Sequence, residues 1–328
     1  MSDNMLKIRG LYVDYHTDEA TIHALNGFDL DLQKGEILGL VGETGAGKTT
    51  MALSILRLLP NGIGRIVSGL IEYNGIDILS ASNEQMRQLR GAGISMIFQD
   101  PMTSLNPIIP VWKQVKEVLD LHFPEMSDLE KEEQVNGMFK MVGLPWDRKD
   151  DYPHQLSGGM KQRIVIAMAL ISEPKLLLAD EPTTALDVTI QAQILELMRE
   201  LKARYDSAMI YITHDLGVIN EFCNNVAVVY AGSVIESGSV EQVFTSGKNH
   251  PYTDGLFKCI PDLYTDTERL IPIPGYMVDP SNIPPGCKFA DRCIHCMGIC
   301  KVEEPAMHPA GDHLIKCHLF TVQKGNEI

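Results

Sequence analysis

The pattern of apolar and polar positions divides the first 250 residues into short strands and helices. Apolar and polar residues alternate in ALNGFDLDLQ, residues 24–33, as in a strand with one buried face. Continuous apolar runs at 36–41, 94–99 and 176–180 predict strands that are buried on both faces. Strands that alternate with helices predict an α/β fold with a mainly parallel sheet, covered on both sides.

The other elements of this region follow from the same patterns. We expect strands at 6–15, at 68–75 with an Asn-Gly turn, and at 208–213, a hairpin at 226–238, and helices at Thr49–Leu59 and Val188–Ala203. Strand patterns are absent from about 100 to 155, which predicts a mostly helical insertion. We therefore expect one domain over 1–250 and a small, proline-broken, cysteine-rich domain over 251–328.

Composition and charge disfavour several classes of protein. Apolar residues make up 45% of the chain, which is enough for a sizeable core, and the formal net charge is -15. A net acidic chain is a poor candidate for binding nucleic acid, since phosphate backbones require clustered Lys and Arg. The start resembles no signal peptide, and the longest apolar run, Ile164–Ile171, is too short to span a membrane. These features predict a cytoplasmic protein unless a partner holds it at a membrane.

A phosphate-binding loop is predicted at GETGAGKT, residues 42–49, because it matches G-x-x-x-x-G-K-[ST] between a buried strand and a helix. Backbone N–H groups of the loop would cradle phosphates, Lys48 would reach the β- and γ-phosphates, and Thr49 would ligate Mg²⁺. The candidate ATP-binding residues here are Gly42, Glu43, Thr44, Gly45, Ala46, Gly47, Lys48, Thr49 and Thr50. A glycine-rich turn without a ligand is the alternative, and the agreement of motif and context disfavours it.

Two carboxylates follow the apolar strand LLLADEP, residues 176–182. This end of a strand is the ligand edge of a doubly wound sheet. Asp180 suits a contact to Mg²⁺, and Glu181 suits the general base that polarises the attacking water. An acidic cap at the end of the strand is the alternative.

The string LSGGMKQR, residues 156–163, resembles the LSGGQ signature of the ABC ATPase family, with Met160 in place of Gln. The other marks of that family appear in its order between about residues 5 and 250: the adenine-stacking Tyr15, the glutamine-loop Gln99, the loop Ala185-Leu186-Asp187 and the switch His214. The resemblance implies a P-loop ABC ATPase fold with a RecA-like core, an antiparallel β subdomain and a helical subdomain.

The resemblance also implies a role for each motif. Ser157, Gly158 and Gly159 would close on ATP held by a partner subunit, so that two subunits sandwich two ATP molecules. Gln99 would contact Mg²⁺ or water, and His214 would bond the γ-phosphate. Without the family resemblance, Tyr15 would be explained as a residue that only packs, and His214 as an ordinary histidine at the end of a strand. Met160 leaves the backbone anion site of the signature intact.

A closer resemblance, to the dipeptide and oligopeptide importer ATPases of bacteria and archaea, is carried by QDPMTSLNP at 99–107, NHPYTDGL at 249–256 and PPGCKFADRC at 284–293. It implies a second homologous ATPase, two transmembrane permease subunits, an extracellular binding protein, no nucleic acid, and a location at the inner face of the cell membrane. The helical insertion would dock a short cytoplasmic helix of a permease. Importers of nickel or oligosaccharides are the alternative for the cargo. An ABC ATPase that acts on DNA or ribosomes, and a regulatory protein without turnover, are alternatives for the class.

Five of the seven cysteines lie within 287–317, while Cys223 and Cys259 are isolated. Four of them have five, six and sixteen residues between them: Cys287, Cys293, Cys300 and Cys317. Four thiolates can hold a [4Fe–4S] cluster or a Zn²⁺ ion, and the family resemblance favours the cluster. Free or oxidised thiols, or a mixed zinc site with His295, His313 or His318, are alternatives, and Cys296 has no assigned role. We expect a structural function, independent of the nucleotide site because the two are far apart in sequence.

Overall fold

The computed structural model describes residues 4–184, 186–259, 272–311 and 313–321. Contacts divide the chain into two compact units. The first unit contains residues 1–5, 32–37 and 80–212, and the second contains 6–31, 38–79 and 213–328. The division at residue 250 that the sequence suggests stays a prediction.

Three parallel strands form the sheet of the first unit. They are β6 (Ile94–Ile97), β7 (Leu176–Asp180) and β8 (Ala208–Thr213). Every residue of these strands is buried, as predicted for residues 94–97 and 176–180, whereas Phe98 and Gln99 of the predicted strand at 94–99 lie beyond β6 and are exposed. Because the strands are parallel, the residues that follow β6 and β7 emerge at the same edge of the sheet.

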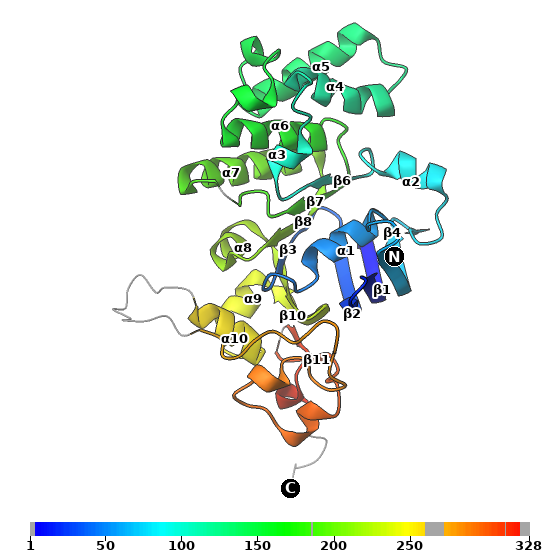
Figure 1. Ribbon diagram of the computed structural model, residues 1–328. Helices are drawn as coiled ribbons and strands as arrows, with labels where there is room; N and C mark the ends of the chain where they lie inside the picture. Colours follow the sequence, from blue (N-terminus) through cyan, green and yellow to red (C-terminus); the bar gives the residue numbers. More distant parts are fainter. Residues whose placement is uncertain (1–3, 185, 260–271, 312, 322–328) are drawn as a thin grey trace. The chain divides into compact units, whose positions relative to one another are not determined.

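Among the described residues from 100 to 155 there is no strand, which agrees with the predicted helical insertion. The first unit contains several helices (Figure 1). They are α2 (Asn83–Leu89), α3 (Pro101–Ser104), α4 (Val111–His122), α5 (Asp128–Met141), α6 (Gly158–Leu170) and α7 (Val188–Tyr205), with short 3-10 turns η1 (Trp146–Arg148) and η2 (Pro153–Gln155). In α4, the buried Val111, Val115 and Leu119 recur every fourth residue and form one apolar face. This face explains why α4 packs against α5 and α6.

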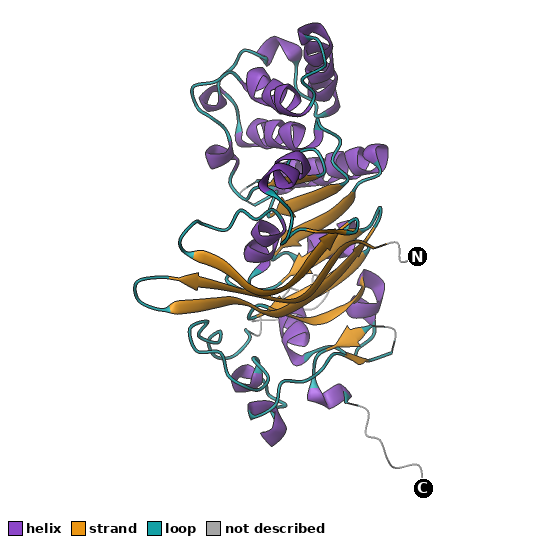
Figure 2. Cartoon of the chain, turned by 90° about the vertical axis from the view of Figure 1, so that its right-hand side faces the viewer, coloured by secondary structure: helices purple, strands orange, loops and turns teal. Residues whose placement is uncertain are grey.

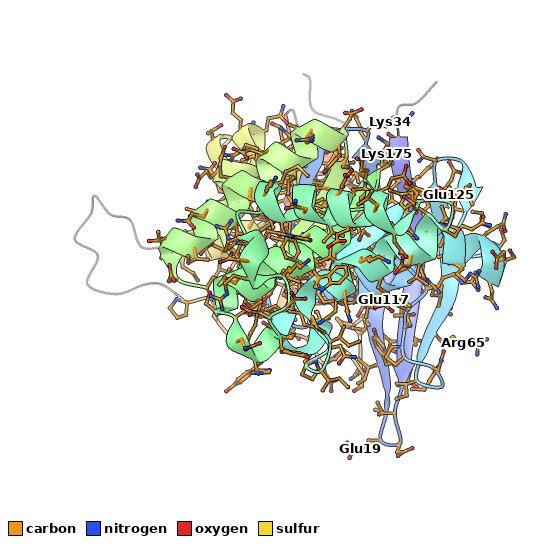
Figure 3. The ribbon with its side chains drawn as sticks, turned by 90° about the horizontal axis from the view of Figure 1, so that it is seen from above. Glu19, Lys34, Arg65, Glu117, Glu125 and Lys175 are labelled. Atoms are coloured by element: carbon orange, nitrogen blue, oxygen red, sulfur yellow. The ribbon has the colours of Figure 1, made fainter. Side chains whose placement is uncertain are left out.

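The second unit contains a four-stranded sheet in the order β2-β1-β4-β5. Its strands are β1 (Asn4–His16), β2 (Thr21–Gln33), β4 (Gly64–Tyr73) and β5 (Ile76–Asp77). Figure 2 draws the strands of the chain in orange. In β2, Phe28, Leu30 and Leu32 are buried while the residues between them are partly or fully exposed, so the predicted alternation is confirmed. The turn between β4 and β5 is the predicted Asn-Gly pair, Asn74 and Gly75, both with positive φ. Figure 3 labels Glu19 at the tip of the turn between β1 and β2.

The second unit also contains a second group of paired strands. The strands are β3 (Ile37–Val41), β9 (Asn225–Tyr230), β10 (Ser233–Ser239), β12 (Leu314–Ile315) and β11 (His308–Pro309). Strand β3 is parallel to β9, and the predicted hairpin β9–β10 is antiparallel. Strands β12 and β11 extend this hairpin in antiparallel register. The C-terminal residues, although largely irregular as predicted, therefore join the sheet through β10.

The helices of the second unit are short. They are α1 (Lys48–Ile55), α8 (Leu216–Phe222), α9 (Val240–Thr245) and α10 (Pro251–Lys258), with 3-10 turns η3 (Ala290–Arg292), η4 (Gly298–Lys301) and η5 (His318–Phe320). The sequence prediction that α1 continues to Leu59 is wrong. Arg57 adopts a left-handed φ of 51°, and the Leu58 N–H donates to the Leu53 carbonyl. This Schellman-type ending closes the helix before Pro60.

None of the helices in the part of the chain that the structure describes combines the length and the apolar character needed to cross a membrane.

Candidate active site

The phosphate loop connects β3 to α1 in the second unit, as predicted. Lys48 is buried at the start of α1, and its Nζ donates to the carbonyls of Gly42 at 2.6 Å and Glu43 at 3.0 Å. Gly47 is left-handed, with φ of 102°, and a Cβ there would lie 2.6 Å from the Ala24 carbonyl oxygen. The loop thus requires glycine at this position and holds the ammonium group of Lys48 against its own backbone.

Tyr15, near the end of β1, lies beside the first turn of α1. Its hydroxyl is 3.1 Å from the Thr50 Oγ1. The structure therefore brings together Tyr15 and the phosphate loop, which are separated in sequence by β2 and β3. This placement is compatible with an aromatic ring that stacks on a nucleotide base.

Gln99 and Glu181 meet in the first unit. Glu181 Oε2 accepts hydrogen bonds from Gln99 Nε2 at 2.9 Å and from Thr184 Oγ1 at 3.0 Å. Gln99 follows β6 and Glu181 follows β7, so the parallel pairing of these strands brings the two side chains to one edge. Two donors on one oxygen fix the direction of the carboxylate, and the sequence did not reveal this contact.

The backbone at Glu181 is unusual. Its φ is 46°, in the left-handed region that residues with a Cβ seldom adopt. The Glu181 N–H donates to the Ile212 carbonyl of β8 at 2.9 Å, which holds the turn in place. Asp180, directly before it, is buried at the end of β7. A non-glycine residue held in this conformation at a candidate catalytic position is typical of functional sites.

The signature residues form the start of α6 in the first unit. Ser157 is the N-cap and its Oγ accepts from the Met160 N–H at 3.3 Å. Ser157 and Gly158 are exposed, and a Cβ on Gly159 would lie 2.9 Å from the Ile190 Cγ2. An exposed helix N-terminus made of small residues can accept an anion on its N–H groups.

Two further predicted residues lie on loops. His214, in the second unit, follows β8 and is exposed. Asp187, in the first unit, caps α7 by accepting from the Ile190 N–H at 2.9 Å. Ala185, which the sequence placed in the same motif as Asp187, lies outside the described residues.

The sequence missed two residues that contact the phosphate loop. Arg292 forms an ion pair with the Glu43 carboxylate at 2.7 Å, and the Tyr252 hydroxyl accepts from the Glu43 N–H at 2.9 Å. Tyr252 lies in the segment 249–256 and Arg292 in the segment 284–293, and both segments indicated only a family resemblance. No local pattern could have found these residues, because Tyr252 and Arg292 lie 209 and 249 positions from Glu43 in the sequence. The contact between Arg292 and Glu43 connects the cysteine region to the phosphate loop, although the sequence predicted that the two are independent in function.

Four cysteines of the C-terminal region line one small cavity: Cys287, Cys293, Cys300 and Cys317. Burial raises the pKa of Cys317 to about 11 and raises the pKa of Cys287 and Cys293 as well. His295 and His318 line the same cavity. Among the described residues, however, no three His, Cys, Asp or Glu side chains are grouped so that they could hold a metal ion. The four cysteines therefore line one cavity, but the described residues do not show a ligand set for the predicted metal site.

Comparison with known proteins covers almost the whole chain. Residues 25–184 match the family model of ABC transporters, and residues 235–300 match that of the C-terminal region of oligopeptide and dipeptide transporters. The dipeptide transport ATP-binding protein DppD of Bacillus subtilis is 45% identical over 97% of this chain and 95% of its own length. The chain belongs to the dipeptide and oligopeptide family of ABC transporter ATP-binding subunits.

Two further proteins are similar to this ABC ATPase. The oligopeptide transport ATP-binding protein OppD of Bacillus subtilis is 44% identical over 96% of this chain and 89% of its own length. Among solved structures, the dimeric post-hydrolysis state of the ATP-binding cassette MJ0796, bound to ADP and Pi, is similar with a TM-score of 0.65. It shares 27% identity and covers 72% of this chain and 99% of that one. These matches confirm the predicted ABC ATPase fold and its activity as an ATPase.

Proposed function

We propose that this ABC ATPase powers the uptake of dipeptides or oligopeptides by an importer at the inner face of the cell membrane. The observation that carries this proposal is the match of residues 235–300 to the C-terminal region of oligopeptide and dipeptide transporters. Similarity to the dipeptide transport protein over 97% of the chain supports the same conclusion. Because the ATPase does not itself contact the cargo, transport measurements must decide between peptides and nickel or oligosaccharides.

The phosphate loop binds the phosphates of ATP. Its N–H groups, with Thr50 and the N-terminus of α1, face the anion, and Lys48 moves from two backbone carbonyls to the β- and γ-phosphates. Tyr15 stacks on the adenine. Thr49, Gln99 and Asp180 would hold Mg²⁺, which would neutralise the charge of the phosphates.

Glu181 acts as the general base. Gln99 and Thr184 both donate to its Oε2, so the carboxylate is oriented before water arrives. His214 donates to the γ-phosphate and holds the attacking water. Ser157 and Gly158, which are exposed, and the partly buried Gly159 close on ATP that a second, homologous ATPase subunit holds, and the dimeric state of the MJ0796 cassette supports such pairing.

A groove of about 550 Å³ in the first unit receives a permease. It is lined by residues of β6, α3, α4 and α6 and of the segments beside β6, among them Phe98, Leu121 and Met168. Leu121 is 71% exposed, and none of the described residues that line the groove is Asp, Glu, Lys or Arg. Burial lowers the pKa of the lining histidine, His122, and so favours its neutral form. An uncharged groove of this kind suits the apolar face of a short helix.

The four cysteines would hold a structural [4Fe–4S] cluster. Their position around one cavity supports this assignment. Zn²⁺ is disfavoured because the described residues offer no ligand group for a single ion. The cluster supplies folding energy to a segment with little apolar core. Cys296 does not line the cavity and has no part in this proposal.

Transport in proteoliposomes tests the function. The chain is reconstituted with two permeases, a second ATPase and a binding protein, and ATP hydrolysis is measured with a dipeptide, an oligopeptide, Ni²⁺ or an oligosaccharide. We expect a peptide to stimulate hydrolysis and to accumulate in the vesicles. Stimulation by Ni²⁺ or by a sugar alone would refute the peptide assignment, and failure to assemble with permeases would refute the importer.

A matched pair of variants tests the docking groove. Leu121→Asp places a charge in the groove, whereas Leu129→Asp places one on an α5 residue that is 68% exposed and does not line it. We expect Leu121→Asp to lose co-purification with the permeases and Leu129→Asp to retain it. Equal behaviour of the two variants would contradict the proposed docking surface.

A further inference from the structure

Residues outside the phosphate loop contact one residue of the loop, Glu43, and hold it in place. The Arg292 guanidinium contacts both oxygens of the Glu43 carboxylate, with Nη1 2.7 Å from Oε2 and Nη2 3.0 Å from Oε1. Such a bidentate pair fixes both distance and orientation. The Arg292 side chain is 5% exposed, so water screens this pair only weakly.

The backbone of the same residue is held by a second contact. The Glu43 N–H donates to the hydroxyl of Tyr252, which is fully buried in α10. The Glu43 carbonyl in turn accepts from Lys48 Nζ at 3.0 Å and from the Ala46 N–H at 3.1 Å. A shift of Glu43 would therefore move the groups that position the phosphate-binding lysine.

Arg292 is itself fixed by its surroundings. Its Nε donates to the Pro274 carbonyl at 3.0 Å, and its Nη1 donates to the Tyr230 hydroxyl at 3.4 Å. The guanidinium also lies 5.8 Å from the ring centres of Tyr230 and Phe289. A side chain with this many partners acts as a rigid support for Glu43.

Because Glu43 is negatively charged, its pairing with Arg292 affects the binding of ATP. A carboxylate in the loop repels the anionic phosphates that the loop is proposed to bind, and Arg292 neutralises it. From this geometry we infer that Arg292 and Tyr252 are positioning residues of the nucleotide site, which set the shape and the charge of the phosphate loop through Glu43. This inference rests on the proposed binding of ATP phosphates to that loop.

The inference also links the cysteine cavity to the nucleotide. Arg292 is the last residue of η3, between Cys287 and Cys293, both of which line the cavity. Any interaction that orders η3 therefore also orders Arg292. By thermodynamic linkage, nucleotide binding must in return stabilise the turn.

The experiment measures the Kd of the full chain for AMP-PNP with Mg²⁺ by calorimetry. In Arg292→Met the Glu43 charge is left unpaired, and we expect the Kd to rise about tenfold or more. Adding Glu43→Gln removes that charge, so the double variant should return to within about threefold of Glu43→Gln alone. This rescue would not occur if Arg292 served only the fold.

Control variants separate the possible failures. Arg9→Met removes an exposed ion pair with Asp31 in the same unit and should leave the Kd unchanged. Lys48→Ala should abolish tight binding; if it does not, both the proposed site and the inference are wrong. A parent-like Kd in folded Arg292→Met, with Lys48→Ala defective, would overturn the inference alone.

Two further measurements keep the test decisive if Arg292→Met fails to fold. Tyr252→Phe removes only the acceptor of the Glu43 N–H and should raise the Kd about threefold, and in the assembled ATPase it should raise KM more than it lowers kcat. Hydrogen exchange should show that AMP-PNP slows the amides of residues 287–293 in the parent. Absence of both effects would overturn the inference.

Discussion

Replacing Glu181 by Gln should remove the proton acceptor while preserving the geometry of the site. Glu181 Oε2 accepts from Gln99 at 2.9 Å and from Thr184 at 3.0 Å. The amide oxygen of Gln can accept both bonds, and Gln has the same size and the same tolerance of a φ of 46° as Glu. We therefore expect the variant to fold like the parent, with a free energy of unfolding changed by less than about 0.5 kcal/mol.

The expected loss of rate follows from the role of a general base. Proton transfer to a positioned side chain contributes about 10²- to 10⁴-fold to a rate. At about 1.36 kcal/mol per factor of ten, the activation barrier should rise by about 2.7 to 5.4 kcal/mol. By contrast, Glu181→Ala would also lose the two hydrogen bonds, each of which contributes about 1 kcal/mol to stability. Gln is thus the variant that isolates the chemistry.

The assay is phosphate release by the assembled ATPase, together with ATP affinity and dimer content by size-exclusion chromatography. We expect unchanged affinity, slow hydrolysis and accumulation of the ATP-bound dimer. Glu173→Gln is a matched control, because Glu173 has a similar φ of 55° and precedes β7, whereas Glu181 follows it. Hydrolysis at the parent rate in Glu181→Gln would show that the base lies elsewhere, and an equal loss in Glu173→Gln would attribute the effect to charge alone.

Three other predictions concern separate parts of the chain. Lys48→Ala should raise the Kd for ATP about 10- to 100-fold, since a charge-assisted contact to the phosphates is lost; unchanged calorimetry would contradict the phosphate-loop assignment. Ser157→Arg should leave ATP binding intact but block dimer closure and turnover, and normal ATPase activity would contradict the sandwich arrangement. Protein purified without oxygen should be brown, with absorption near ~400 nm and about four irons per chain. Cys287→Ser should lose the iron and weaken ATP binding about fivefold or more through Arg292, whereas colourless protein with one zinc would overturn the iron–sulfur assignment.

Local sequence determined most of the elements and the identity of the main motif. The alternation in β2, the apolar runs of β6 and β7, and the Asn-Gly turn after β4 all formed as predicted. These predictions succeed because burial on one or both faces of a strand imposes its own period on the residues. The phosphate loop was equally visible, since its glycines, Lys48 and Thr49 are contiguous and their geometry depends on neighbouring residues.

The end of α1 shows where local patterns are insufficient. Apolar residues continue to Leu59, yet the helix ends at Ile55 because Arg57 adopts a left-handed conformation more typical of Gly. A propensity argument does not reveal such an ending, because the required φ is disfavoured for Arg when it is considered alone.

Tertiary structure alone decided which distant side chains meet. Gln99 and Glu181 are 82 residues apart, and Glu43 and Arg292 are 249 residues apart. No periodicity in the chain encodes either pair, because each depends on strand order or on the return of the C-terminal segment to the sheet through β10 and β12. The sequence by itself therefore determined which residues form the phosphate loop and the other motifs. The folded chain determined that Glu181 accepts a hydrogen bond from Gln99 and that Arg292, beside the cysteine cavity, pairs with Glu43, because hydrogen bonds of this kind require atoms within about 3 Å, which only packing provides.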